Sequence, residues 1–276
     1  MKLTLISHFY NEEILLPYWI NHYVNMVDHA IMIDYSSDDN SVDIIKTMAP
    51  HWEIRPSKNK YFNTEIIDEE VMAIEEEISE WKMVLNTTEF VLKPDLKSYL
   101  LRFDSTFPNF GAISTNGIWM VDTKETRNIP LDNRSLVLQR WHGFFENEKI
   151  PLKLHPNKEI YLSNGGRSRL IHNKKNGQYL PGRHMTNVPN YKDPNLLLLW
   201  FAYSPFDVSK KRKLQIYNKK SEQYIKSVIE KRGGDYLECM LTKTEEELET
   251  KLAHFQTLSQ DLNNNPTYLK AIQQYN

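Results

Sequence analysis

The sequence predicts an α/β fold with a mostly parallel central sheet flanked by helices, followed by a helical extension at the C-terminal end. Short apolar segments alternate with helix-like segments up to residue 85, which favours a doubly wound parallel sheet. Beyond residue 95 this alternation stops and isolated strands are expected within irregular polar stretches. Helical periodicity returns from residue 207 onwards.

The elements of the first part follow from apolar spacing. Strands are expected over residues 2–9, 29–34, 52–55 and 81–85, where short apolar runs end in polar residues. Helices are expected over residues 12–25, 41–48 and 64–79. The last helix is the best defined, because Ile67, Val71, Ile74 and Ile78 recur on one helical face while glutamates occupy the other.

The second part has a weaker pattern. Strands are expected near residues 110–121, 135–142 and 167–172, and a further helix over 245–262. We expect two domains, residues 1–205 and 206–276, with the first divided into halves 1–92 and 93–205. Long polar loops over a rigid sheet are common places for substrate contacts.

The composition excludes several classes of protein. The net charge of −2 over 276 residues provides no overall field for binding nucleic acid. The single cysteine allows no internal disulfide, and the longest apolar run, residues 196–202, is too short for a membrane span. The first residues lack the apolar stretch of a secretory leader, so a cytoplasmic protein is expected. Glycine-rich phosphate loops are absent.

Polar clusters follow three of the predicted strands. They are residues 8–13 (HFYNEE), residues 34–41 (DYSSDDNS) and residues 86–90 (NTTEF). Ligands of open α/β sheets bind at the carboxyl ends of the strands, so the three clusters are expected to converge on one crevice. In particular, positions 11, 34 and 88 are expected to line a common cleft.

These clusters resemble the GT-A glycosyltransferases of the family-2 type. The opening matches the pattern N-E-E-x-x-L-x-x-W-x-x-H of one branch through Asn11, Glu12, Leu16, Trp19 and His22. The block at 34–41 fills the place of the family's second acidic block, and N-T-T-E-F at 86–90 fills the place of D-x-D-E-F. The resemblance covers residues 1–92 well and 110–220 loosely, and implies that the half 1–92 binds the nucleotide and the half 93–205 the acceptor.

The resemblance also implies roles for residues at the strand ends. Asp34 would accept a hydrogen bond from the N3–H of uracil, because a carboxylate only accepts. Asn11 and Glu12 would lie near the ribose or the base, with His8 and Ser36 beside them. The structural alternative for Asn11 and Glu12 is capping of the helix that follows. Asp39 and Ser41 are interpreted as caps of the second helix.

The D-x-D position departs from the family pattern. In the family these two aspartates help to hold Mn²⁺ or Mg²⁺ against the donor's diphosphate, but here they are Asn86 and Thr88. Three alternatives follow. Thr88, Glu89 and His184 hold a metal ion; basic side chains replace the metal; or the site is inactive.

Basic residues of the second part are candidates for binding phosphate. Arg169, Arg183 and Lys213 are predicted to contact the diphosphate, because a guanidinium fork suits phosphate oxygens. Lys213 belongs to the basic run 210–213, which alternatively contacts an anionic lipid-linked acceptor, as a peripheral membrane contact, or is a solvated helix face.

Inverting transfer, which the resemblance implies, requires a general base for the acceptor hydroxyl. Asp122, after the strand that ends near 121, is the candidate. Its rivals are Glu125, Asp132 and Glu146.

The function expected is transfer of a sugar from a nucleoside diphosphate sugar, UDP first, to a glycan or lipid-linked glycan, as in polysaccharide biosynthesis. One alternative is a catalytically degenerate relative that only binds a nucleotide or glycan. A nucleotidyltransferase is a second alternative, less favoured because no glycine-rich loop is present to hold a triphosphate.

Overall fold

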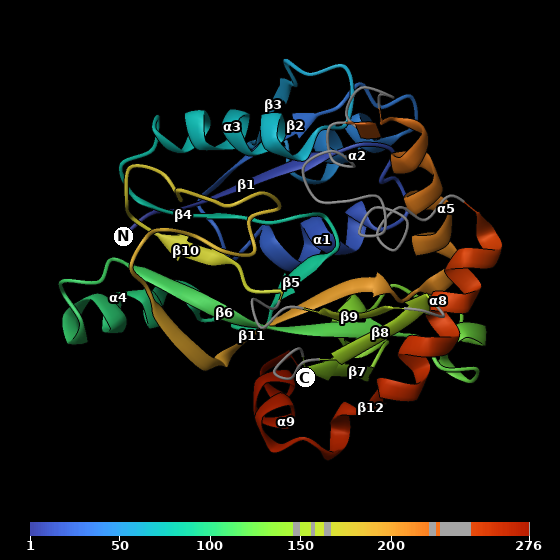
Figure 1. Ribbon diagram of the computed structural model, residues 1–276. Coiled ribbons are helices and arrows are strands. Elements are labelled where there is room, and N and C mark those ends of the chain that lie inside the picture. The colour runs from blue at the N-terminus through green and yellow to red at the C-terminus, as the bar shows by residue number, and fades with distance from the viewer. Residues whose placement is uncertain (146–149, 156–157, 163–166, 221–224, 227–243, 276) are drawn as a thin grey trace.

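The computed structural model describes residues 1–145, 150–155, 158–162, 167–220, 225–226 and 244–275 (Figure 1). Its main strands are β1 (Leu3–Phe9), β2 (His29–Asp34), β3 (Glu53–Pro56), β4 (Trp81–Val84), β5 (Glu89–Val91), β6 (Ala112–Val121), β7 (His142–Phe145), β10 (Leu170–His172), β11 (Tyr191–Tyr203) and β12 (Gln260–Asp261). Its helices are α1 (Leu16–Tyr23), α2 (Ser41–Met48), α3 (Thr64–Glu75), α4 (Leu96–Thr106), α5 (Phe206–Asn218), α8 (Glu245–Leu258) and α9 (Pro266–Ile272).

One sheet runs through the molecule in the order β12-β7-β6-β10-β4-β1-β2-β3, and β11 joins it beside β6 and β5. The four strands β3, β2, β1 and β4 pair in parallel, as does β6 with β11. The other pairs in this sheet are antiparallel. A separate hairpin consists of β8 (Ile150–His155) and β9 (Lys158–Leu162).

Helices cover both faces of the parallel strands, because successive side chains point to opposite faces. Leu3 and Leu5 of β1 pack in the core cluster that holds α1 and α2, whereas Ile6 packs in the cluster that holds α3. Figure 1 shows α3 on one side of β1 and α1 on the other. The predicted α/β architecture, with a central sheet flanked by helices, is therefore confirmed.

The elements up to residue 85 agree with the predicted ranges to within one residue at each end, except at two helices. The helix predicted over 64–79 ends at Glu75, and the first helix also differs. That helix was expected from residue 12 but begins at Leu16, with Pro17 in its first turn. Proline suits the first turn because its missing N–H would have no partner there. Residues 12–15 instead form a turn, in which the N–H of Glu12 donates to Ser41 Oγ at 2.8 Å.

The prediction of a strand over 135–142 is wrong. Residues Leu136–Leu138 form a 3-10 turn, and β7 begins only at His142. The Gln139 side chain closes this loop, because its Oε1 accepts from the N–H of Asp132 and its Nε2 donates to the carbonyls of Asp132 and Arg134. The strand β11, the helix α4 and the short strand β5 were not predicted.

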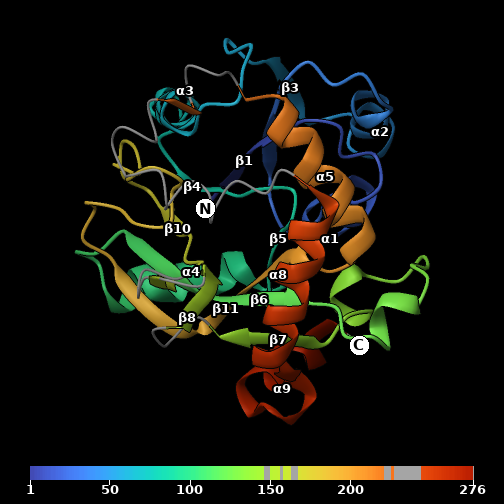
Figure 2. The same ribbon diagram turned by 45° about the vertical axis from the view of Figure 1, so that its right-hand side comes forward.

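The C-terminal segment is helical as expected and packs on the sheet. α8 contributes Leu248, Leu252 and Phe255 to a cluster with Trp119 and Trp200. The helix expected over 245–262 ends at Leu258, and β12 then pairs with β7 at the edge of the main sheet. Figure 2 shows α5 and α8 next to each other along one side of the molecule. The domain boundary at 205 stays a prediction.

No helix among the described residues combines the length and the apolar character needed to cross a membrane.

Candidate nucleotide site

A cavity of about 210 Å³ lies at the carboxyl ends of β1 and β4. Its floor is built by these two strands, which pair in parallel with Ile6 opposite Val84. Parallel pairing brings their carboxyl ends to the same edge, so that His8 after one strand and Asn86 and Thr88 after the other line the same hollow. The walls come from the loops before β11 and from α5.

A buried ion pair fixes the segment after β4. Glu89 is 0% exposed and Arg169 is 2% exposed, and the guanidinium donates to both carboxylate oxygens at 2.7 and 2.9 Å. The remaining guanidinium nitrogen donates to the carbonyl of Gly182 at 2.7 Å. Burial opposes ionisation of Glu89, but the charge of Arg169 outweighs it and the pKa of Glu89 lies below its ordinary value. The pair therefore stays charged at neutral pH.

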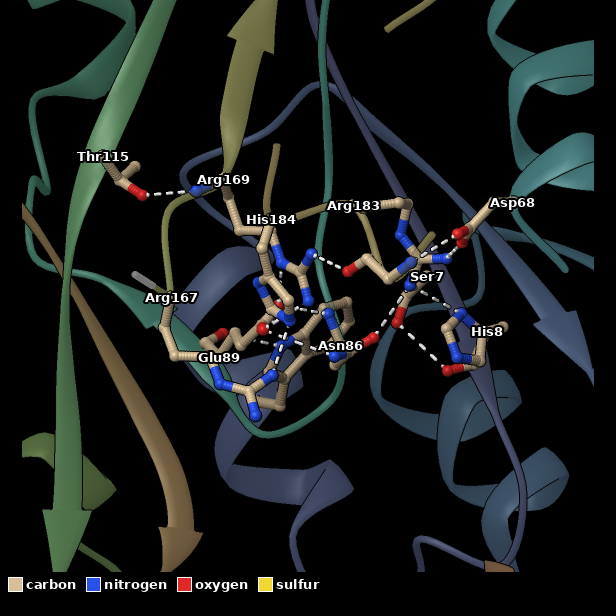
Figure 3. Close-up of polar contacts among 12 residues, drawn as sticks. Ser7, His8, Asp68, Asn86, Glu89, Thr115, Arg167, Arg169, Arg183 and His184 are labelled. Atoms are coloured by element: carbon tan, nitrogen blue, oxygen red, sulfur yellow. Dashed lines mark hydrogen bonds and ion pairs between the residues drawn. The ribbon is translucent and has the colours of Figure 1, made fainter. Parts of the chain in front are cut away.

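Arg183 lies on the other side of Asn86. Its guanidinium forms a short ion pair with Asp68 of α3 and donates to Asn86 Oδ1 at 3.0 Å. The N–H of Gly182 donates to the same Asp68 at 2.7 Å. Gly182 and Arg183 both have positive φ angles, of +91° and +60°, so the loop turns sharply where it meets α3. Figure 3 shows Arg183 between Asp68 and Asn86.

Arg167 and His184 form a third contact at the cavity. An Arg167 guanidinium nitrogen lies within hydrogen-bond distance of His184 Nε2, and the same guanidinium lies over the Trp200 ring, 3.4 Å from its centre. Burial, and then the charges of Arg169, Arg167 and Arg183, lower the pKa of His184 well below its ordinary value of 6.5. The imidazole is therefore neutral at pH 7. Figure 3 shows Arg167 and Arg169 next to this histidine, whereas the Arg183 side chain points toward Asp68.

Helix α5 forms one wall of the cavity. Arg212 forms an ion pair with Glu12, which is 4% exposed, although the two residues are 200 positions apart. Burial raises the pKa of Glu12, and Arg212 opposes this effect. About two turns further along, Lys219 Nζ lies 4.1 Å from the centre of the Tyr10 ring.

Aromatic and apolar side chains line the rest of the cavity. They are Phe9, Tyr10, Tyr35, Phe62, Ile67, Trp200 and Ile216. The hydroxyl of Tyr35 donates to the carbonyl of Tyr61 at 3.0 Å, which ties β2 to the loop before α3. The cavity thus combines cationic and aromatic side chains in its lining, which suits a ligand that carries both phosphates and a ring.

The structure brings six of the predicted site residues to this cavity: His8, Glu12, Thr88, Arg169, Arg183 and His184. Burial, and then Arg183, Arg212 and Arg169, lower the pKa of His8 well below 6.5. The roles assigned to these six stay predictions.

Three predicted nucleotide-binding residues lie elsewhere, which corrects the expectation of one cleft for positions 11, 34 and 88. Asn11 lines a neighbouring hollow of about 170 Å³ that shares Glu12 and Arg212 with the cavity. Its side chain exchanges two hydrogen bonds with Asp38, at 2.6 and 3.0 Å. Asn11 does not cap α1, because the N-cap of α1 is Leu15.

Asp34 and Ser36 line neither hollow, although Tyr35 between them lines the cavity. Asp34 Oδ1 accepts from the N–H of Ser37 at 2.9 Å and so shapes the turn after β2. Ser36 is exposed with a φ of +61°. The prediction that Asp39 and Ser41 cap α2 is wrong, because the N-cap of α2 is Asn40. Asp39 accepts from the N–H of Ser41, while Ser41 Oγ accepts from the N–H of Glu12.

The residues proposed for a metal site do not fit a divalent cation. Both oxygens of Glu89 and one nitrogen of His184 already contact arginines, and Thr88 offers only a neutral hydroxyl. Within the described ranges, no group of three or more His, Cys, Asp or Glu side chains is arranged to hold a metal ion. Hard cations prefer carboxylate oxygens that are not shared with guanidinium groups.

Asp122 is buried away from the cavity, which corrects the prediction of a general base there. It is 1% exposed and accepts from Ser204 Oγ at 2.6 Å and from the N–H of Phe206 at 2.7 Å. It also pairs with Arg140 at 3.2 Å. Asp122 therefore anchors the start of α5. Its rivals Glu125 and Asp132 do not line the cavity, and Glu146 lies outside the described residues.

Lys213 does not line the cavity either. Its ammonium group lies over the rings of Tyr203 and Trp200, at 4.6 and 5.6 Å from their centres. Its neighbour Arg212 contacts the cavity instead, and is the member of the basic run that bears on this site.

Some lining residues were missed because their sequence context gives no signal. Phe62, Ile67 and Trp200 look like ordinary core residues, and Asp68 looks like one of the many acidic residues of α3. Only the fold shows that Asp68 is 3% exposed and paired with Arg183.

No protein-family profile matches the chain, and no curated protein matches it in sequence. Among solved structures, residues 1–349 of Staphylococcus aureus TarS, in complex with UDP-GlcNAc, are similar with a TM-score of 0.33 and 13% identity. That match covers 48% of this chain and 37% of the other. The mannosyltransferase PcManGT of Pyrobaculum calidifontis, in complex with GDP-Man and Mn²⁺, has a TM-score of 0.45 and 11% identity, over 99% and 74% of the two chains.

A third similar structure is the glucosyl-3-phosphoglycerate synthase of Mycobacterium tuberculosis with Mn²⁺ and UDP-Glc, with a TM-score of 0.32 and 11% identity, over 46% of each chain. Identity does not exceed 13% and the TM-score does not exceed 0.45 in these three comparisons. The function is therefore inferred from the cavity itself.

Proposed function

We propose that the chain is a glycosyltransferase that takes a sugar from a nucleoside diphosphate sugar and passes it to a glycan or lipid-linked glycan. The observation that carries this proposal is the cavity at the ends of β1 and β4, whose lining combines cationic and aromatic side chains. Its place at the carboxyl ends of parallel strands is where open α/β sheets bind nucleotides.

The donor fits this cavity in one orientation. The diphosphate lies among Arg167, Arg183 and Arg212, where guanidinium groups match phosphate oxygens. The base lies toward Tyr10, Tyr35 and Phe62, where rings offer a surface for stacking. Uracil is the first base to test, because residues 1–92 resemble GT-A glycosyltransferases of the family-2 type, and UDP is the donor nucleotide expected from that resemblance.

The reaction is a displacement at the anomeric carbon. The bond between this carbon and the diphosphate oxygen breaks, its electron pair stays on the leaving diphosphate, and a bond forms to the acceptor oxygen. The proton of the acceptor hydroxyl passes to a base. Cations at the leaving group lower the barrier because they stabilise the charge that develops there. Inversion at the anomeric carbon is part of the proposal.

The experiment is a thermal unfolding series with UDP, GDP, CDP and dTDP, followed by donor hydrolysis with the matching sugar nucleotide. A ligand that binds the native state at about 100 times its Kd raises stability by roughly 2.7 kcal/mol. We expect one nucleotide to raise Tm and its sugar conjugate to be consumed. A Tm that no nucleotide changes would contradict the proposal.

A second candidate is a binding protein that has lost catalysis. Two observations favour it. Positions 86 and 88 hold neutral residues, and none of the candidate bases among the described residues, Asp122, Glu125 and Asp132, lines the cavity. Donor turnover separates the two, because this candidate binds the nucleotide but consumes no donor with or without Mn²⁺.

A further inference from the structure

We propose that this cavity holds the donor's diphosphate with arginine side chains in place of a divalent metal ion. The inference rests on the proposed function and adds how the phosphates are recognised. It begins from the three contacts that arginines make with residues 86, 89 and 184, where the resemblance had predicted metal ligands or their replacements.

Each of these polar groups is already bound to a guanidinium. Asn86 Oδ1 accepts from Arg183 at 3.0 Å, and both oxygens of Glu89 accept from Arg169. His184 faces Arg167 through its Nε2. A cation entering here would have to break a buried ion pair and would lie next to several positive charges, and both effects oppose its binding.

The charge balance favours an anion. Among the described residues that line the cavity, the cationic ones are Arg167, Arg169, Arg183, Arg212 and Lys219, and the anionic one is Glu12. Counting the carboxylates that pair with them from behind, Asp68 and Glu89, the five cations still exceed the three carboxylates. A diphosphate supplies negative charge of the size that this excess accommodates.

The arginines are also held in place before a ligand arrives. Glu89, Asp68 and Glu12 each fix one guanidinium through an ion pair with little exposure. A fixed donor loses little rotamer freedom on binding, so its contact with phosphate costs less than that of a solvated lysine. The carboxylates therefore position arginines rather than a metal ion.

The direct test is calorimetric titration of the full chain with UDP in excess EDTA and again in Mn²⁺ without chelator. We expect the two Kd values to agree within about threefold. Uridine, which has no phosphate, is the reference ligand, and we expect UDP to bind at least about tenfold more tightly than uridine in EDTA, because charge-assisted hydrogen bonds to phosphate supply the difference.

The variant test removes one buried pair together, so that no charge is left unpaired. Arg183→Gln combined with Asp68→Asn should raise the Kd of UDP in EDTA about tenfold to a hundredfold and leave the Kd of uridine nearly unchanged. The matched control is Arg102→Gln with Asp95→Asn, an exposed ion pair on α4, which should leave both affinities unchanged. Lys219→Met should raise the Kd of UDP by a smaller factor. This variant replaces the double variant in the test if the double variant does not fold.

Two outcomes would overturn the inference, and they differ. UDP binding that EDTA abolishes, or that Mn²⁺ strengthens more than about tenfold, would show a metal site and leave the proposed function standing. Failure of UDP, GDP, CDP and dTDP to bind under either condition would remove the proposed function and this inference together.

Discussion

The segments at the ends of the first strands and the late segments over them contribute different things to the cavity. The early segments, 8–12 and 86–90, line its floor and supply Glu12, Asn86 and Glu89, whose side chains accept hydrogen bonds from the arginines. The late segments, 167–184 and α5, bring most of its charge, through Arg167, Arg169, Arg183 and Arg212. The recognisable patterns of this chain thus mark the scaffold, and the chemistry comes largely from residues without a pattern.

The early pattern is explained by its contacts. Trp19 Nε1 and Tyr23 OH both donate to the carbonyl of Glu89, at 3.1 and 3.0 Å, and His22 Nε2 contacts the carbonyl of Val91 at 3.0 Å. Residues of α1 therefore hold β5 and with it the carboxylate that fixes Arg169. The spacing W-x-x-H places both side chains on the face of α1 that meets β5.

The largest effect is expected where the two regions meet. Glu89→Ala leaves Arg169 buried without its carboxylate and should lower the free energy of unfolding by about 3–5 kcal/mol, as breaking a buried pair does. Urea denaturation measures it. Replacing both residues, Glu89→Leu with Arg169→Met, should lower the free energy of unfolding much less than Glu89→Ala does.

A control for that variant is Asp132→Ala, which removes an exposed ion pair with Arg134. This variant should lower the free energy of unfolding far less, because exposed ion pairs contribute little to stability. If Glu89→Ala costs no more than Asp132→Ala, the buried pair does not join the two regions energetically.

His22 provides a pH test of the early region. Burial lowers the pKa of His22 to about 4, against 6.5 in the unfolded chain. Below pH 6.5 the unfolded chain therefore binds a proton that the folded chain does not, so stability falls as pH falls toward 4. The loss from this group is on the order of 3 kcal/mol. Urea denaturation at pH 7 and pH 4 measures this. Between these two pH values, the free energy of unfolding of His22→Gln should fall by about 3 kcal/mol less than that of the unmodified chain. Equal decreases in the two proteins would contradict this role of His22.

Asp122 tests whether a residue predicted to be catalytic is structural. Asp122→Asn removes the charge that Arg140, Ser204 and the N–H of Phe206 contact, and should lower the free energy of unfolding by about 1.5–3 kcal/mol. The matched variant Glu125→Gln, at an exposed position, should lower the free energy of unfolding far less. Full stability combined with lost donor turnover would instead restore Asp122 as the base.

The smallest effect is expected at Asn11. Asn11→Gly keeps the positive φ of +51° but loses the two hydrogen bonds with Asp38, and should cost about 1 kcal/mol while leaving UDP affinity within about twofold. Thermal unfolding and titration with UDP measure the two quantities. A large loss of affinity with unchanged stability would return Asn11 to the nucleotide site.

The sequence predicts much of the fold because apolar spacing is a local property. The buried face of α3 appears directly as Ile67, Val71 and Ile74. β11 was missed because its first residues, Tyr191 to Asn195, are polar and include a proline, so only its apolar second half resembles a strand.

The site was less predictable because its pairs join distant residues. Arg212 meets Glu12 across 200 positions, and Arg183 meets Asp68 across 115. Nothing in the basic run 210–213 distinguishes Arg212, which reaches the cavity, from Lys213, which packs on aromatic rings. Local spacing indicates that polar residues follow a strand, but not which of them satisfy the backbone and which face a ligand.

The measurement that tests the central claim most directly is amide hydrogen exchange with and without UDP. If early and late segments build one nucleotide site, UDP should slow exchange together in peptides covering 8–12, 86–90, 182–184 and the second half of α5, and leave α4 unchanged. Protection confined to other parts of the chain, or exchange that UDP leaves unaltered throughout, would contradict the claim.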